Sequence, residues 1–113
     1  MRRMSLAAML FCLLLPFGAN AQGLTTQQYR HPKTEKDLNY NKAYLDGIKD
    51  GLNAYNISTG EKLFCMPGYP PLTFEKADNL VLRWSSKKKA DVDLLPVGLT
   101  LLYALKEAYP CRN

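Results

Sequence analysis

The amino-acid sequence predicts an all-α fold, a small helical bundle of three to four helices with one disulfide. Apolar residues recur at three- and four-residue spacing in two segments, which is typical of helices with one buried face. A third segment near the C-terminus is apolar around almost its whole circumference, and no segment alternates as a half-buried strand does. With 113 residues, the chain fits one domain.

The first predicted helix runs from Asp37 to about Asn56. Its apolar stripe consists of Tyr44, Leu45, Ile48, Leu52 and Tyr55. A second stripe, four residues apart, consists of small residues: Ala43, Gly47 and Gly51. Each glycine costs about 1 kcal/mol of helix stability relative to alanine. Two glycines in register therefore indicate either that another backbone packs closely on this face or that the helix is weak or kinked.

The second predicted helix begins after Thr73, a good N-cap residue, and runs to about Ser86. Its apolar face consists of Phe74, Ala77, Leu80, Val81 and Trp84. The connector before it, residues 57–72, contains three prolines and cannot continue a helix.

The third predicted helix starts near Asp93, holds Pro96 in its first turn and ends at about Tyr109. A helix that is apolar all round must be covered all round. We therefore expect either that an extra short helix packs on it or that part of it forms a subunit interface.

Residues 1–21 are expected to form a Sec-type signal peptide. A positive head is followed by an uncharged apolar run over residues 6–17 and by Ala19-Asn20-Ala21, a small-x-small pattern before Gln22. Twelve apolar residues span about 18 Å as a helix, less than the ~30 Å of a bilayer core, so cleavage is favoured over a membrane anchor. A lipoprotein is not expected, because Phe11 stands before Cys12 where a lipobox has a small residue. The chain is therefore expected in the periplasm, without membrane attachment after cleavage.

The mature part divides into a polar stretch without period over residues 22–36, predicted to be a flexible arm, and a helical domain over residues 37–113. Removing Arg2 and Arg3 leaves 13 basic residues against 10 acidic ones, a net charge of +3. This modest charge and export both argue against a nucleic-acid partner.

Cleavage also removes Cys12 and leaves Cys65 and Cys111. An even pair of cysteines in an exported chain predicts a disulfide. The loop it closes makes the bond worth about 4 kcal/mol on the chain-entropy model. Two cysteines and the single, distant His31 are too few ligands for a metal site, and the C-x-x-C spacing of redox proteins is absent.

Residues suited to catalysis are sparse. His31 is the only histidine and lies in the predicted arm. Asp46 and Asp50 share one helix face, but Lys42 and Lys49 lie beside them, which favours a solvated surface over an acid–base pair. Common nucleophile, phosphate-binding and metal-binding motifs are missing, so we predict neither an enzyme nor a cofactor.

Several features share the spacing of a known family. These are the segment Tyr44-Leu45-Asp46-Gly47, the Cys65-Met66-Pro67 triplet, a Trp-containing helix, and Tyr109-Pro110-Cys111. Over about residues 40–111 the chain resembles the Tai-type immunity proteins of type VI secretion. The resemblance implies a helical periplasmic protein, often a homodimer, that binds a peptidoglycan amidase toxin and occludes its active-site cleft.

In that family a protruding loop between the later helices inserts into the toxin. By position, the resemblance places this loop at about residues 85–93 and makes the following candidate partner-binding residues: Ser85, Ser86, Lys87, Lys88, Lys89, Asp91 and Asp93. The plainer interpretation of the three lysines is that they offset the negative end of the helix dipole. The alternative function is a disulfide-containing periplasmic stress chaperone, or another exported binding protein without a toxin partner.

Overall fold

The computed structural model describes residues 23–67, 71–88 and 90–112 of the chain. Within these ranges the protein is all-α, as predicted, and its helices are α2 (Thr26–Arg30), α3 (Glu35–Ser58), α4 (Phe74–Lys88), α5 (Ala90–Asp93) and α6 (Val97–Ala108). No helix among them is both long and apolar enough to cross a membrane. The predicted signal peptide, residues 1–21, lies outside the described residues.

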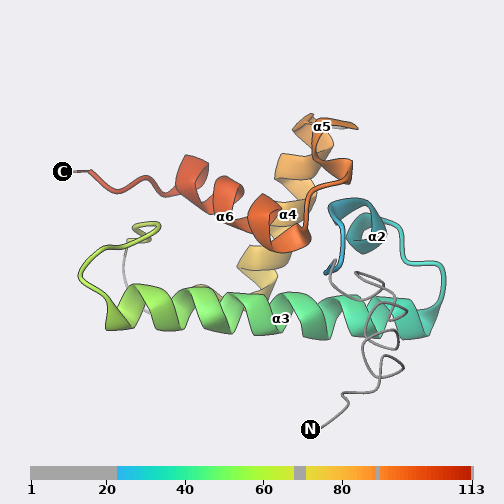
Figure 1. The fold of residues 1–113 in the computed structure, drawn as a ribbon, viewed down its shortest axis with the longest axis horizontal. Helices are drawn as coiled ribbons and strands as arrows, with labels where there is room; N and C mark the ends of the chain where they lie inside the picture. Colours follow the sequence, from blue (N-terminus) through green and yellow to red (C-terminus); the bar gives the residue numbers. More distant parts are fainter. Residues whose placement is uncertain (1–22, 68–70, 89, 113) are drawn as a thin grey trace, which may run out of the picture.

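The long helix α3 forms the base of the molecule. In Figure 1, α4 rises from the middle of α3, α6 crosses in front of α4 on the same side of α3, and α2 and α5 lie toward the same end of the molecule. The residues that pack between these helices form one core, which contains Tyr29, Leu45, Phe64, Leu72, Ala77, Val81, Val97, Leu101 and Leu105.

Helix α3 begins two residues before the predicted start and ends two residues after the predicted end. Thr34 is its N-cap, and the Asp37 N–H donates to the Thr34 hydroxyl at 3.0 Å. Nothing among the described residues lies within 4 Å of where a β-carbon on Gly47 or Gly51 would sit. The small-residue stripe therefore faces away from the rest of the described chain, and no backbone of this part packs on it.

Helix α4 has the predicted N-cap. The Thr73 hydroxyl accepts from the Lys76 N–H at 3.3 Å, and the Thr73 carbonyl accepts from the Ala77 N–H at 3.0 Å. The helix extends two residues beyond Ser86 to Lys88, and both of its last lysines stand in the turn where the dipole favours cations.

The predicted third helix corresponds to α6 and begins about four residues later than predicted. Asp93 ends α5, and α6 starts only at Val97, with Pro96 as its N-cap. A residue before proline is disfavoured from continuing a helix, and the carbonyl of Leu95, which precedes Pro96, accepts a hydrogen bond from the Thr26 N–H at 2.9 Å. The prediction that Pro96 lies within the first helical turn was therefore wrong, because the segment before it pairs with the chain near α2.

The structure also differs from the prediction of a flexible arm over residues 22–36. From Gly23 onward this segment is ordered around α2, whose N-cap Thr25 forms a reciprocal capping box with Gln28. Tyr29 is 6% exposed and its hydroxyl donates to the Asp78 carboxylate. Burial, together with this carboxylate, raises the pKa of the Tyr29 phenol. The stretch is polar because its contacts to other helices are largely hydrogen bonds.

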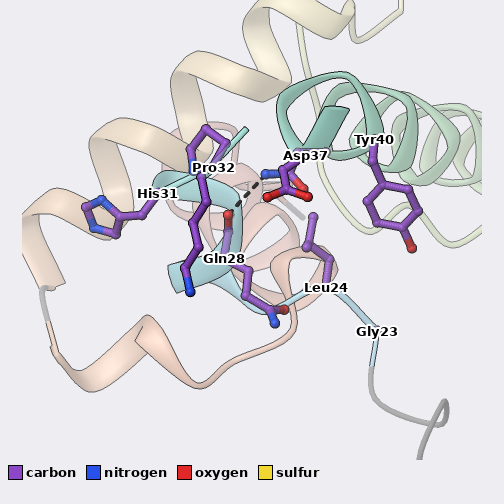
Figure 2. Close-up of a pocket in the computed structure, with 9 residues that line it drawn as sticks. Gly23, Leu24, Gln28, His31, Pro32, Asp37 and Tyr40 are labelled. Atoms are coloured by element: carbon purple, nitrogen blue, oxygen red, sulfur yellow. Dashed lines mark hydrogen bonds between the residues drawn. The ribbon is translucent and has the colours of Figure 1, made fainter. Parts of the chain in front are cut away.

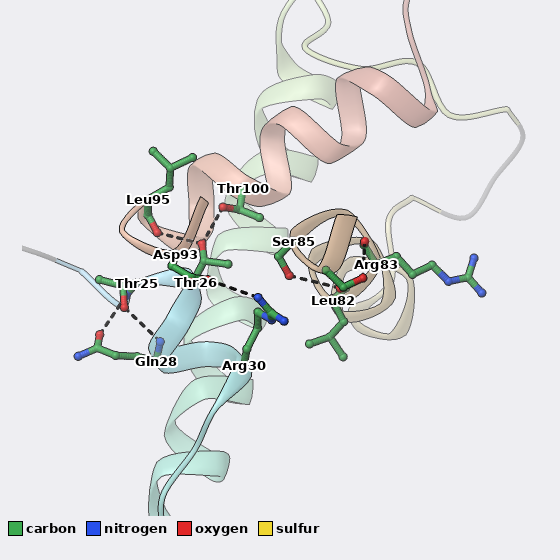
Figure 3. Close-up of polar contacts among 11 residues, drawn as sticks. Thr25, Thr26, Gln28, Arg30, Leu82, Arg83, Ser85, Asp93, Leu95 and Thr100 are labelled. Atoms are coloured by element: carbon green, nitrogen blue, oxygen red, sulfur yellow. Dashed lines mark hydrogen bonds and ion pairs between the residues drawn. The ribbon is translucent and has the colours of Figure 1, made fainter. Parts of the chain in front are cut away.

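Thr26 makes two of these polar contacts. Its hydroxyl lies 2.7 Å from the Thr100 hydroxyl of α6 and donates to the Leu95 carbonyl at 2.9 Å (Figure 3). Both threonines are completely buried, so each satisfies the other in a site without access to water. This pair attaches the N-terminal segment to α6.

The connector between α3 and α4 is held from two sides. Two α3 side chains clamp its backbone: Asn53 exchanges two hydrogen bonds with Leu72, and Asn56 bonds Leu63 and Phe64. On the other side, the predicted disulfide joins Cys65 to Cys111.

Candidate partner-binding surface

The residues predicted as partner contacts do not form a protruding loop. Residues 85–88 are the last turn of α4, and residues 90–93 are the short helix α5. Lys89, between them, lies outside the described residues. The segment is therefore a helical corner at one end of the molecule (Figure 1).

Ser85 is not a surface residue, which corrects its assignment. It is 0% exposed, because it follows Ala77 and Val81 at four-residue spacing on the buried side of α4. Its hydroxyl donates to the Leu82 carbonyl at 3.3 Å (Figure 3), which satisfies the hydroxyl within the helix. A partner cannot reach it without opening the core.

Asp93 is engaged within the chain. Its carboxylate lies 3.3 Å from the Arg30 guanidinium, so an ion pair joins α5 to α2 (Figure 3). Of the predicted contacts, the ones that stand exposed at the corner are Ser86, Lys87, Lys88 and Asp91. We call these four residues the α4–α5 corner.

The corner is continuous with an aromatic pair that the sequence analysis did not single out. The Lys88 ammonium lies over the Trp84 ring, 5.6 Å from its centroid, and the Trp84 ring lies 6.1 Å from that of Tyr103 on α6. The Trp84 indole N–H donates to the Glu107 carboxylate at 2.5 Å. A cation over an indole face and a satisfied indole N–H together orient this side chain.

Part of α6 remains uncovered beside this pair. Leu99 and Tyr103 are 39% and 44% exposed, whereas Val97, Leu101 and Leu105 are fully buried. The sequence indicated that this helix has excess apolar surface, because it is apolar almost all round, but it did not indicate which side stays exposed. The short helix α2 packs on α6, as the first of the two expectations requires. One arc of α6 still faces outward, and the expected subunit interface stays a prediction.

A hollow of about 430 Å³ lies elsewhere, between α2 and the start of α3, and includes His31 and Asp37 in its lining. Figure 2 shows the His31 imidazole pointing away from the Asp37 carboxylate. The lining contains no serine, threonine or cysteine that His31 could activate. The polar groups of this hollow therefore do not form a nucleophile–base pair.

The other side chains that could take part in chemistry also have partners within the chain. Asp46 and Asp50 both bind the Lys49 ammonium, at 2.7 Å and 3.0 Å, and these carboxylates raise the pKa of Lys49. Cys65 and Cys111 are joined to each other in the disulfide. Across the described ranges, no cluster of three or more His, Cys, Asp or Glu residues is arranged to hold a metal ion.

Of the comparisons with known proteins, the one with protein families gives a match. No curated protein and no solved structure is significantly similar to the chain. Residues 9–111, however, match the family described as Rap1a immunity proteins, and the match covers both cysteine motifs and every described helix. The chain belongs to the Rap1a immunity protein family of type VI secretion, whose function implies a toxin effector as its partner.

Proposed function

We propose that this protein acts in the periplasm as an immunity protein against a peptidoglycan amidase effector of type VI secretion. It binds the amidase, occludes its active-site cleft and so protects the producing cell from its own toxin and that of its siblings. The family match over residues 9–111 carries the immunity function. The amidase target rests on the resemblance to Tai-type proteins, and the periplasmic site rests on the signal-like residues 1–21.

The cysteine motifs support the Tai-type subgroup. Cys65-Met66-Pro67 and Tyr109-Pro110-Cys111 are far apart in the chain, and the disulfide brings them together. The Cys65 N–H also donates to the Tyr109 carbonyl at 2.8 Å. The two motifs that carry the resemblance therefore form one structural unit.

The α4–α5 corner is the part of the surface that we propose enters or borders the amidase cleft. Lys87 and Lys88 are exposed at a helix end, and Asp91 is exposed on the next helix. Charges at the rim of an interface govern association rate and specificity more than total affinity. We also propose, from the same resemblance, that the protein is a homodimer in solution, which light scattering of the purified chain would measure.

The first test is formation of the complex. The chain from Gln22 onward is mixed with the amidase encoded by the neighbouring gene, and peptidoglycan hydrolysis is followed during titration. We expect a stable complex and loss of hydrolysis at an equimolar ratio. Hydrolysis that continues at full rate, with no complex on a sizing column, contradicts the proposal.

The second test is charge reversal at the corner. Lys87→Glu combined with Lys88→Glu is expected to weaken amidase binding about tenfold or more while the melting temperature changes little, because both side chains are exposed. Lys36→Glu combined with Lys42→Glu is the matched control, since it makes the same change of charge on exposed positions of α3. Equal affinity of the two double variants would refute the assignment of the corner.

A further inference from the structure

Helices α4 and α6 leave one side of their contact open to solvent. Along α4, Leu80 and Trp84 are half-buried and one turn apart; along α6, Leu99 and Tyr103 are more exposed and also one turn apart. Trp84 and Tyr103 join the two rows, with ring centroids 6.1 Å apart. We call these four residues the aromatic face.

The central side chain of the aromatic face is held in place before any partner arrives. The Trp84 indole N–H donates to Glu107 at 2.5 Å, and the Lys88 ammonium lies 5.6 Å from the ring centroid. Ordering a free side chain on binding has an entropic cost that opposes association. An indole that is already oriented avoids most of that cost, and tryptophan and tyrosine are the residue types that most often dominate binding energy.

The rim of the aromatic face is almost entirely cationic. Its exposed charged side chains lie three or four residues from the face on the same helices, and the cations among them are Lys76, Arg83, Lys87, Lys88 and Lys106. None of these five forms an ion pair with another described residue. The one carboxylate among them, Glu107, already accepts the Trp84 N–H.

This charge pattern discriminates between occupants. A second copy related by a twofold axis presents the same patch to itself, so it brings cations opposite cations. Like charges juxtaposed across an interface oppose association. A partner with an apolar centre and carboxylates around it satisfies both the rings and the rim.

We propose that the aromatic face is the principal contact with the toxin effector, and that the toxin surface it meets has an apolar centre rimmed by carboxylates. The proposal rests on the immunity function. It extends the contact from the α4–α5 corner, through Lys88, onto α6. In it Trp84 and Tyr103 supply the affinity, and the surrounding cations accelerate association.

The first arm of the test compares tyrosines. Tyr103→Ala is measured against Tyr55→Ala by calorimetry with the amidase of the neighbouring gene, because Tyr55 is an equally exposed tyrosine, 41% against 44%, on α3. We expect Tyr103→Ala to raise Kd at least thirtyfold, the change typical of a hot-spot residue, and Tyr55→Ala to change it less than threefold. Trp84→Phe, which keeps an aromatic ring at this position but removes the indole N–H and the five-membered ring, is a second variant for which folding is easier to preserve.

The second arm tests the carboxylate rim. Arg83→Glu is expected to slow association at least fivefold at low salt, and the difference should disappear in 0.5 M NaCl, because exposed charges are screened. An association rate that is unchanged at low salt overturns the acidic character of the toxin surface.

The outcomes separate this proposal from the immunity function. If the wild type binds and Tyr103→Ala and Trp84→Phe bind within threefold of it, the aromatic face is not the contact, although the immunity function stands. If these variants instead turn a dimer into a monomer, the face covers a second copy and the proposal is wrong. If the wild type itself neither binds nor inhibits, both ideas fail together.

Discussion

Removal of the disulfide, by Cys65→Ser combined with Cys111→Ser, is expected to cost about 4 kcal/mol of unfolding free energy. The bond joins residues 46 apart in sequence, and closing a loop of this length removes that much chain entropy from the unfolded state. The folded state has other restraints at the same place. The Cys65 N–H donates to the Tyr109 carbonyl at 2.8 Å, and Asn56 bonds the backbone of Leu63 and Phe64.

Because these restraints persist without the bond, we expect the double variant to keep its helices at low temperature and to lose stability. Small domains unfold with about 5–15 kcal/mol, so the loss is a large share of the total. At about 4–8 °C per kcal/mol for a domain of this size, the melting temperature should fall by about 15–30 °C.

The assay is urea and thermal unfolding of the chain from Gln22 onward, followed by circular dichroism at 222 nm. Reductant should lower the stability of the wild type by the same amount and leave the double variant unchanged. A loss below 1 kcal/mol, or two free thiols in the unreduced wild type, would refute the reasoning.

Two further predictions concern the attachment of α2. The pKa of the buried Tyr29 is raised in the folded state, so its contribution to stability is complete below the ordinary tyrosine pKa of about 10 and falls as pH rises above it, by up to about 1.4 kcal/mol per pH unit. In urea unfolding between pH 10 and 11, the unfolding free energy of Tyr29→Phe should therefore fall less steeply with pH than that of the wild type. Equal slopes for the two proteins would contradict this. Thr26→Val should cost about 1–3 kcal/mol because it leaves the buried Thr100 hydroxyl without its partner; adding Thr100→Val should recover part of that loss in the same assay, and strictly additive losses would argue against the pairing.

The long helices could be predicted because their signals are local. The apolar spacing around Leu45 and Val81 and the N-cap at Thr73 each depend on a few neighbouring residues, and the structure places α3 and α4 within two residues of the predicted ends. The disulfide could be predicted because only two cysteines remained after the expected cleavage.

Helix α2 could not be predicted in the same way. Five residues are too few to form a stable helix alone, and what stabilises α2 lies far away in sequence. The buried Tyr29 hydroxyl needs Asp78 of α4, and the Thr26 hydroxyl needs Thr100 of α6. The polar composition of residues 22–36 therefore indicated a flexible arm, because the distant partners of its polar groups cannot be recognised in the sequence.

For the candidate binding surface, too, some features follow from local sequence and others from tertiary contacts. Local sequence patterns were enough to predict α3, α4 and the cysteine pair, and to indicate that the last helix carries more apolar surface than a chain of this size can cover. Only the tertiary structure decided which arcs are covered: Ser85 faces the core, whereas Leu99 and Tyr103 face outward. The physical reason is that helix periodicity is local, while the side of a helix that becomes buried depends on the crossing of α4 and α6 and on where α2 attaches.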